Sequence, residues 1–194
     1  MIVKRSPSGL DVSVVIPAHN EADNLPKLIE EIAAALEPTG KWYEIVVVDD
    51  ASADETPSLL QKLSNKYSSL VCHRMARQSG QSSALSAGFD LASGDVVVTI
   101  DADLQNDPAD IPKLLAELAH ADVAIGWRRD RKDTFCKRII SKVANRVRNY
   151  MTGECVKDTG CGLKAFKAES LRRIHRFDGM HRFFPTLVKM HGYS

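Results

Sequence analysis

Residues 96–105, VVVTIDADLQ, decide the fold because they join a buried-strand pattern to a cluster of polar side chains. A continuous apolar run of this kind is typical of a strand covered on both faces. Asp101 and Asp103 follow the run, and side chains two residues apart on an extended segment point to the same side. Two adjacent carboxylates repel each other, and Mg2+ or Mn2+, which prefers hard oxygen ligands and shares itself with substrate phosphates, relieves that repulsion. We therefore expect a metal–diphosphate site at the end of this strand, with Gln105 beside it.

The same acids also allow a purely structural interpretation. Asp101 can open a turn, and Asp103 and Asp107 can cap the helix that follows. Asp107-Pro108 has the pattern of an N-cap followed by proline at the first helical position. A short DxD motif does not by itself decide between the two interpretations.

The first 126 residues alternate predicted strands with predicted helices. Apolar runs predict strands at 12–16, 44–48, 70–74, 95–100 and 122–125. Helical spacing of apolar residues predicts helices at 24–36, from Thr56, at 82–92 and at 108–119, with Asn24 as the cap of the first. Such alternation is typical of an open α/β fold whose parallel sheet is covered on both faces. Ligands of such sheets bind beyond the carboxyl ends of the strands.

Three polar clusters follow predicted strands and should meet at that edge of the sheet. They are residues 17–21, Asp49-Asp50 and residues 101–105. Because carboxyl ends of parallel strands lie at one edge, three clusters there indicate a binding site more strongly than any one of them.

The remainder of the chain differs in charge. Residues 1–126 carry 19 acidic and 9 basic side chains, whereas residues 127–194 carry 6 acidic and 17 basic ones. This asymmetry indicates an anionic partner for the second part. Residues 134–151 fit a basic amphipathic helix, for which contact with an anionic membrane surface and ordinary packing of an apolar face both stay open. Nucleic acid is disfavoured because no nucleic-acid-binding motif accompanies the helix. A strand at 163–166 and a helix from about Glu169 complete the prediction.

Composition restricts the class of protein further. At 194 residues and 44% hydrophobic content, the chain suits one domain with a sizeable core. No apolar run approaches the roughly 20 residues that a membrane-spanning helix needs, and the N-terminus lacks the apolar core of a signal peptide, so we expect a cytoplasmic protein with reduced cysteines. The absence of GxGxxG after the first strand and of GxxxxGK[ST] argues against a dinucleotide-dependent dehydrogenase and a P-loop ATPase.

Five segments together resemble family 2 glycosyltransferases. They are PAHNE (17–21), VVDDASADET (47–56), GFDLASGDVVVTIDADLQNDP (88–108), GWRRDR (126–131) and DTGCGLKAF (158–166). Their order and spacing are similar to those of polyprenol-phosphate sugar transferases, which include dolichol-phosphate mannosyltransferase and bacterial undecaprenyl-phosphate relatives. The resemblance covers nearly the whole chain.

The resemblance implies a GT-A fold, with an open, mostly parallel Rossmann-like sheet flanked by helices, and an inverting transfer that needs Mg2+ or Mn2+. The sugar would come from GDP-mannose or a UDP-sugar and would go to a dolichyl or undecaprenyl phosphate. It also implies one domain over 1–194, in which residues 1–126 form the nucleotide-sugar-binding half and residues 127–194 the acceptor side. Members of the family continue beyond the point that corresponds to HGYS, some of them with transmembrane helices, so we expect a truncated chain that lies peripherally on the cytoplasmic membrane face.

The resemblance assigns donor binding to the first two loops. Pro17, His19 and Glu21 resemble the first nucleotide-binding loop, and Asp50 resembles the residue that holds the base or ribose. The family commonly has tyrosine where this chain has His19. An imidazole stacks similarly but adds a titratable proton.

The resemblance also implies the catalytic and acceptor residues. Arg128 and Arg131 occupy the loop that faces the acceptor phosphate, and Asp158 lies in a segment that closes over the reacting centre, although it also suits a turn cap before Gly160. The implied ligands of the metal and the diphosphate are Asp101, Asp103 and Gln105.

The alternative functions are transfer to a glycan hydroxyl and non-catalytic binding of a nucleotide sugar. A hydroxyl acceptor needs a general base, whereas a phosphate monoester is already ionised at neutral pH. The arginine cluster therefore favours the phosphate acceptor, because arginine binds phosphate oxygens in pairs.

Overall fold

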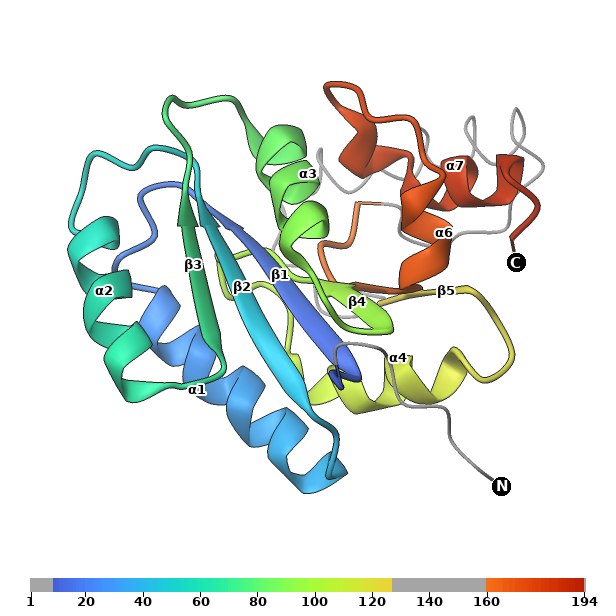
Figure 1. Ribbon diagram of the computed structural model, residues 1–194, viewed down its shortest axis with the longest axis horizontal. Coiled ribbons are helices and arrows are strands. Elements are labelled where there is room, and N and C mark those ends of the chain that lie inside the picture. Colours follow the sequence, from blue (N-terminus) through green and yellow to red (C-terminus); the bar gives the residue numbers. More distant parts are fainter. Residues whose placement is uncertain (1–8, 127–159, 194) are drawn as a thin grey trace, which may run out of the picture.

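The computed structural model describes residues 9–126 and 160–193 of the chain (Figure 1). Within these residues, six strands form one sheet in the order β3-β2-β1-β4-β6-β5. The neighbours β3, β2, β1 and β4 are parallel, and β6 runs antiparallel to both β4 and β5. The sheet is therefore mostly parallel, with one reversed strand next to its centre.

The elements alternate along the chain as the sequence predicted. The strands are β1 (Val12–Ala18), β2 (Tyr43–Asp49), β3 (Leu70–Arg74), β4 (Val96–Thr99), β5 (Val123–Ile125) and β6 (Lys164–Lys167). The helices are α1 (Leu25–Leu36), α2 (Thr56–Lys66), α3 (Gln81–Leu91), α4 (Ile111–Glu117), α6 (Ala168–Arg172) and α7 (Phe184–Met190), with short 3-10 turns η1 (Glu37–Thr39), η2 (Pro108–Asp110) and η3 (Met180–Arg182).

The strand predicted at 163–166 exists as β6, and because it is antiparallel to its neighbours the sheet is mostly, not wholly, parallel. One expectation about the elements needs correction. The helix predicted over 108–119 is split into η2 and α4. Pro112 has no N–H to donate to the Pro108 carbonyl, and the Ile111 N–H bonds that carbonyl instead in a tighter turn. The helix predicted over 134–151 lies outside the described residues.

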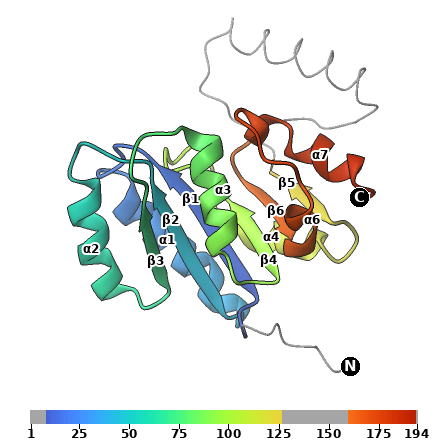
Figure 2. The ribbon, with the colours of Figure 1, turned by 45° about the horizontal axis from the view of Figure 1, so that its top comes forward.

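Apolar side chains divide between two helical layers, one on each face of the sheet (Figure 2). Along β1, Val12, Val14 and Ile16 join the core beneath α1, α2 and α4, whereas Val15 joins the core beneath α3, α6 and α7. This explains why the strand lacks alternating polarity: both of its faces are buried. In the parts of the chain that the structure describes, no helix is long and apolar enough to cross a lipid bilayer.

A buried polar network fixes the amino-terminal edge of the sheet. Ser13 in β1 donates from Oγ to Glu44 Oε1 in β2 at 2.6 Å. The Ser93 N–H donates to the same carboxylate oxygen at 2.7 Å, and the Gly94 N–H donates to Ser13 Oγ at 2.8 Å. The connection from α3 to β4 is thereby tied to β1 and β2, which sets where β4 begins and hence where Asp101 emerges at its other end.

Gly88 provides a test of how closely α3 packs on the sheet. A Cβ at Gly88 would overlap Val15 Cγ1 and contact Val48. We expect Gly88→Ala to lower the free energy of unfolding by about 1–2 kcal/mol, because overpacking outweighs the gain in helix propensity. Urea-induced unfolding measures the loss. The double variant with Val15→Ala should lose less than the sum of the two single losses; strict additivity would contradict the contact.

Candidate active site

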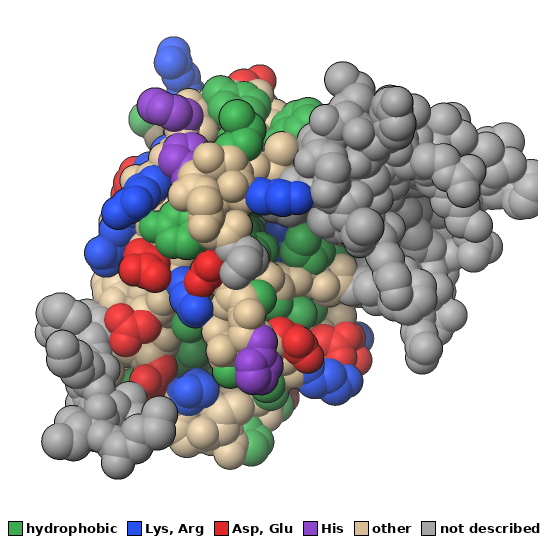
Figure 3. Space-filling model, turned by 90° about the vertical axis from the view of Figure 1, so that its right-hand side faces the viewer, with side chains coloured by type: hydrophobic (Ala, Val, Ile, Leu, Met, Phe, Trp, Pro, Cys, Tyr) green, Lys and Arg blue, Asp and Glu red, His purple; other side chains and the backbone are tan. Residues whose placement is uncertain are grey.

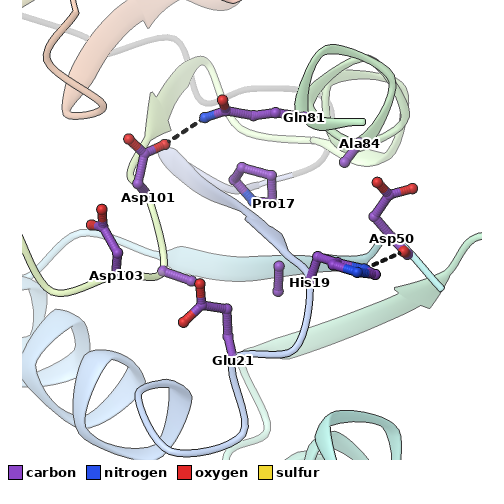
Figure 4. A pocket seen from close by; sticks show the side chains of 10 residues that line it. Pro17, His19, Glu21, Asp50, Gln81, Ala84, Asp101 and Asp103 are labelled. Atoms are coloured by element: carbon purple, nitrogen blue, oxygen red, sulfur yellow. Dashed lines mark hydrogen bonds between the residues drawn. The ribbon is translucent and has the colours of Figure 1, made fainter. Parts of the chain in front are cut away.

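Loops at the carboxyl edge of the sheet enclose a cavity of about 260 Å3 (Figure 4). The loops follow β1, β2 and β4, and the first turn of α3 closes the remaining side. The cavity is lined by Pro17, Ala18, His19, Glu21, Asp50, Gln81, Ala84, Asp101, Ala102 and Asp103. The three polar clusters predicted to meet at this edge therefore do meet there.

The sequence predicted all four carboxylates in this lining but not all of its polar residues. Six of the predicted residues line the cavity, namely Pro17, His19, Glu21, Asp50, Asp101 and Asp103. Gln105 has an exposed side chain and is not among the lining residues. Gln81 lines the cavity and was not predicted, since nothing in its Gly/Ser-rich surroundings marks it. Three further predicted site residues lie outside the described residues: Arg128, Arg131 and Asp158.

Asp101 is held in place from two sides. Gln81 Nε2 donates to its Oδ1 at 2.8 Å. On the other side, Gly162 approaches so closely that a Cβ there would overlap the carboxylate. Gly162 is itself fixed, because Thr99 Oγ1 in β4 donates to its carbonyl at 2.9 Å. Asp101 directly precedes the turn at residues 102–103, as the structural interpretation predicted, and its carboxylate also lines the cavity.

The loop after Asp101 serves both structure and cavity. Asp103 Oδ1 accepts the Gln105 N–H at 3.1 Å, which closes a tight turn around Leu104. Leu104 adopts a left-handed backbone with φ of 58°, a conformation that costs about 1–3 kcal/mol in a non-glycine residue and gathers at functional sites. Asp107 accepts the Ala109 N–H at 2.9 Å and caps η2, as the structural interpretation predicted. Asp107 therefore has the capping role that the structural interpretation gave it. Asp103 stabilises the turn around Leu104 and also lines the cavity.

His19 joins three loops through both ring nitrogens. Nδ1–H donates to the Asp50 carbonyl at 2.8 Å, and this bond assigns the proton to Nδ1. Nε2 then accepts from Asn20 Nδ2 and Gln78 Nε2, each at 3.2 Å. These contacts hold the His19 ring in the cavity wall.

Asp50 organises the opposite wall. It is 4% exposed, and its two carboxylate oxygens accept the N–H groups of Ser79 and Gly80, each at 2.7 Å. Gly80 has φ of 85°, a backbone conformation that favours glycine, and it precedes the first residue of α3. Asp50 therefore orders the loop before α3. The expectation that it also holds a base or ribose stays a prediction.

The first two loops are interlocked by backbone donors. The Asn20 N–H donates to Ser52 Oγ at 2.9 Å, and the Ala53 N–H donates to Asn20 Oδ1 at 2.8 Å. Asp54 accepts the N–H groups of Thr56 and Ala22. Desolvation acts to raise the pKa of Asp54, but the hydrogen bonds from Thr56 and Ala22 outweigh it and hold that pKa below its ordinary value. Ionised Asp54 thus helps to hold the two loops together.

Glu21 stands at the entrance to α1, and its surroundings correct one expectation. Its N–H donates to Thr56 Oγ1 at 3.0 Å, and its Oε2 accepts from Asn24 Nδ2 at 2.7 Å. Asn24 stands at the cap position of α1 as expected, but its backbone is already helical (φ −93°, ψ −36°) and its side chain makes no capping bond; its Nδ2 donates to Glu21. The turn is already formed by the Glu21 carbonyl, which accepts the N–H groups of Asn24 and Leu25. Glu21 thus has the structural role that its place before a helix allows, and it also lines the cavity.

The electrostatics of the cavity favour a bound cation. Four carboxylates line it, those of Glu21, Asp50, Asp101 and Asp103. Among residues 9–126 and 160–193, no three His, Cys, Asp or Glu side chains converge closely enough to hold a metal by themselves. Two carboxylates that leave other positions to phosphate oxygens are the arrangement that suits Mg2+ or Mn2+ in nucleotide sites.

Comparison with known families agrees with the fold and the motifs. The model of glycosyl transferase family 2 matches residues 13–174. The chain belongs to this family, and its fold is the GT-A fold.

Curated relatives are similar over most of this chain. An undecaprenyl-phosphate 4-deoxy-4-formamido-L-arabinose transferase of Enterobacter sp. is 39% identical over 179 residues, which cover 91% of this chain and 55% of the relative. A dodecaprenyl-phosphate galacturonate synthase of Rhizobium johnstonii is 37% identical over 183 residues, which cover 92% and 54%. The chain thus spans about half the length of the curated relatives it matches.

Solved structures share the fold. A mannosyltransferase from Pyrobaculum calidifontis in complex with GDP-Man and Mn2+ is 25% identical, with a TM-score of 0.72 over 98% of this chain and 55% of that chain. A glucosyl-3-phosphoglycerate synthase from Mycobacterium tuberculosis, in complex with Mn2+, UDP-glucose and phosphoglyceric acid, is 21% identical, with a TM-score of 0.71 over 92% and 64%. At that identity the second likeness concerns the fold alone.

Gly162 offers a test of the cavity that does not alter any charge. Gly162→Ala adds a Cβ that collides with the Asp101 carboxylate. Because that carboxylate must then move, we expect Mn2+-dependent binding of UDP or GDP to weaken by about 10-fold or more, measured by titration calorimetry.

Gly40→Ala is the matched control. Gly40 has φ of 65° at the end of η1 and is not among the residues that line the cavity, so a Cβ there strains the backbone away from the site. It should lower the melting temperature without changing nucleotide affinity at a temperature where the variant is folded. Equal affinities for Gly162→Ala and the wild type would contradict the placement of Asp101 at the ligand.

Proposed function

We propose that this chain is the nucleotide-sugar-binding domain of an inverting glycosyltransferase that moves a sugar to a polyprenyl phosphate. The observation that carries the proposal is the pair Asp101 and Asp103 on a cavity formed at the carboxyl edge of the sheet. The names of the relatives, which are 37–39% identical, support the acceptor class.

The residues present fit a divalent cation at the edge of the cavity. Asp101 and Asp103 would hold it, with Gln105 as the third predicted ligand. Bound there together with a nucleotide diphosphate, Mg2+ or Mn2+ would stabilise as a Lewis acid the charge that develops on the leaving group. The structural neighbours contain Mn2+, which supports a divalent cation in general. That this cation is either Mg2+ or Mn2+ is part of the proposal.

The chain's own side chains prepare the donor site before any ligand arrives. His19 and Asp50 fix the loops after β1 and β2 against the start of α3, so the walls of the cavity are set by hydrogen bonds within the protein. A preorganised wall orients the donor without the cost of ordering loops during binding. We assign Pro17, His19, Glu21 and Asp50 to the donor.

The acceptor side needs positive charge more than it needs a base. A phosphate monoester is already ionised at neutral pH, so its oxygen attacks the anomeric carbon without proton removal. The requirement is then to bring a second anion close to the donor diphosphate. Arg128 and Arg131 are the proposed acceptor-phosphate residues, and Asp158 is proposed to position one of the reacting groups.

The face formed by the last described residues suits an anionic surface. Residues 160–193 contain seven Lys or Arg residues and two acidic residues, of which Lys164 is buried and Lys167 and Arg176 pair with Asp122 and Asp90. Figure 3 shows Lys, Arg and His side chains gathered on the upper part of this face. Such a face is attracted to anionic lipid headgroups, which supports a peripheral position on the membrane where the lipid acceptor lies.

A donor panel tests the proposed function. The chain is incubated with Mn2+ and each of several UDP- and GDP-sugars, with and without a short polyprenyl phosphate, and the release of UDP or GDP is measured. We expect release from one class of donor that depends on both the cation and the lipid. Release that instead requires a glycan hydroxyl would favour transfer to glycans, and nucleotide-sugar binding without any release would favour a non-catalytic relative.

Asp103→Asn tests the carboxylate pair within that assay. The change keeps the shape of the side chain and removes its charge, so we expect turnover to fall about 100-fold or more with little change in melting temperature.

Asp107→Asn is the matched control for Asp103→Asn. It makes the same substitution four residues further along the same loop, where Asp107 caps η2 and where asparagine also caps well. Turnover should stay near the wild-type value. Wild-type turnover in Asp103→Asn would remove the metal assignment.

A further inference from the structure

Gln81 is the first residue of α3 and reaches across the cavity to Asp101 (Figure 4). Its Nε2 lies 2.8 Å from Asp101 Oδ1, within the range of a good charge-assisted hydrogen bond. The two residues are 20 positions apart and come from different elements. The contact therefore depends on how α3 packs on the sheet.

The backbone around Gln81 is fixed on both sides. Before it, the Gly80 N–H donates to Asp50 Oδ2 at 2.7 Å. After it, Ser82, which is 3% exposed, accepts the Gly179 N–H at 3.0 Å and lies 2.8 Å from His181 Nδ1. A side chain whose backbone is held so firmly delivers its amide to a defined point at low cost in conformational entropy.

A neutral donor is chemically suited to this position. An N–H group on Oδ1 restricts the rotation of the carboxylate without adding a charge. A lysine here would bring a charge that competes with the cation, and an acid would repel Asp101. An amide does neither. Gly162 limits the same carboxylate from its other side.

We propose that Gln81 is a positioning residue that orients Asp101 for the divalent cation. The inference rests on the proposed function, because it assumes that Asp101 and Asp103 bind the cation of a nucleotide diphosphate. It adds a residue that acts through Asp101.

Direct binding of Mn2+ tests the inference without turnover. Free Mn2+ is followed by electron paramagnetic resonance in the presence of the full chain and UDP or, separately, GDP. Gln81→Met keeps the length of the side chain and removes the N–H donor, whereas Gln81→Ala removes both. We expect both variants to bind Mn2+ about 10-fold more weakly, with melting temperatures near that of the wild type.

A pH profile separates positioning from packing. In Gln81→Glu a second carboxylate faces Asp101, and two adjacent acids share a proton over a range where a lone acid is ionised. Mn2+ affinity of this variant should therefore fall more steeply than that of the wild type as the pH is lowered from 8 to 6. Gln61→Glu makes the same substitution on the exposed side of α2 and should leave the wild-type profile unchanged.

The outcomes distinguish this inference from the function on which it rests. Wild-type Mn2+ affinity in Gln81→Met, or a wild-type pH profile in Gln81→Glu, would overturn the positioning role. A loss of Mn2+ affinity in Asp103→Asn in the same experiments would still support the proposed metal site. Mn2+ binding that Asp103→Asn leaves unchanged, or no saturable binding to the wild type, would overturn the proposed function and the inference together.

Discussion

The gathering of like charge at one edge of the sheet is the constraint on which the rest of the structure depends. Glu21, Asp50, Asp101 and Asp103 line a single cavity, where their like charges repel one another. Hydrogen bonds from amide groups hold these carboxylates in place. Such a cluster favours binding of a cation, and a cation bound there favours binding of a diphosphate.

The sheet supplies the rigidity that this arrangement needs. The Ser13–Glu44 network fixes β4 at its amino end, and Thr99 joins its other end to Gly162. Asp101 thus emerges from a strand whose position is set at both ends. The interlocked loops around His19 and Asp50 then fix the opposite wall, so the cavity is shaped before a ligand binds.

The sequence predicted the parts of the fold that depend on local pattern. Apolar runs located β1, β2 and β4 because burial on both faces leaves a continuous signature. They also located the edge strands β3 and β5, which are only partly buried. The direction of β6 was not predictable, since LKAF reads the same whether the strand runs parallel or antiparallel. The division of the helix at 108–119 was visible in principle, because Pro112 falls where an α-helix would need its N–H.

The candidate site shows the same limit. Acids that directly follow strands were found because topology brings strand ends together. Gln81 was missed because its role depends on a contact with Asp101, 20 residues away in the sequence. The hydrogen bond from Asn24 to Glu21 depends equally on three-dimensional geometry. Family resemblance named the residues that touch ligands, whereas the structure shows the residues that hold them.

Anomalous X-ray scattering from manganese tests the central claim most directly. Crystals of the chain grown with Mn2+ and UDP or GDP should show an anomalous peak within coordination distance of carboxylate oxygens of Asp101 or Asp103, with the diphosphate on its other side. A nucleotide bound in the cavity with manganese placed elsewhere, or a cavity that binds neither, would contradict the account.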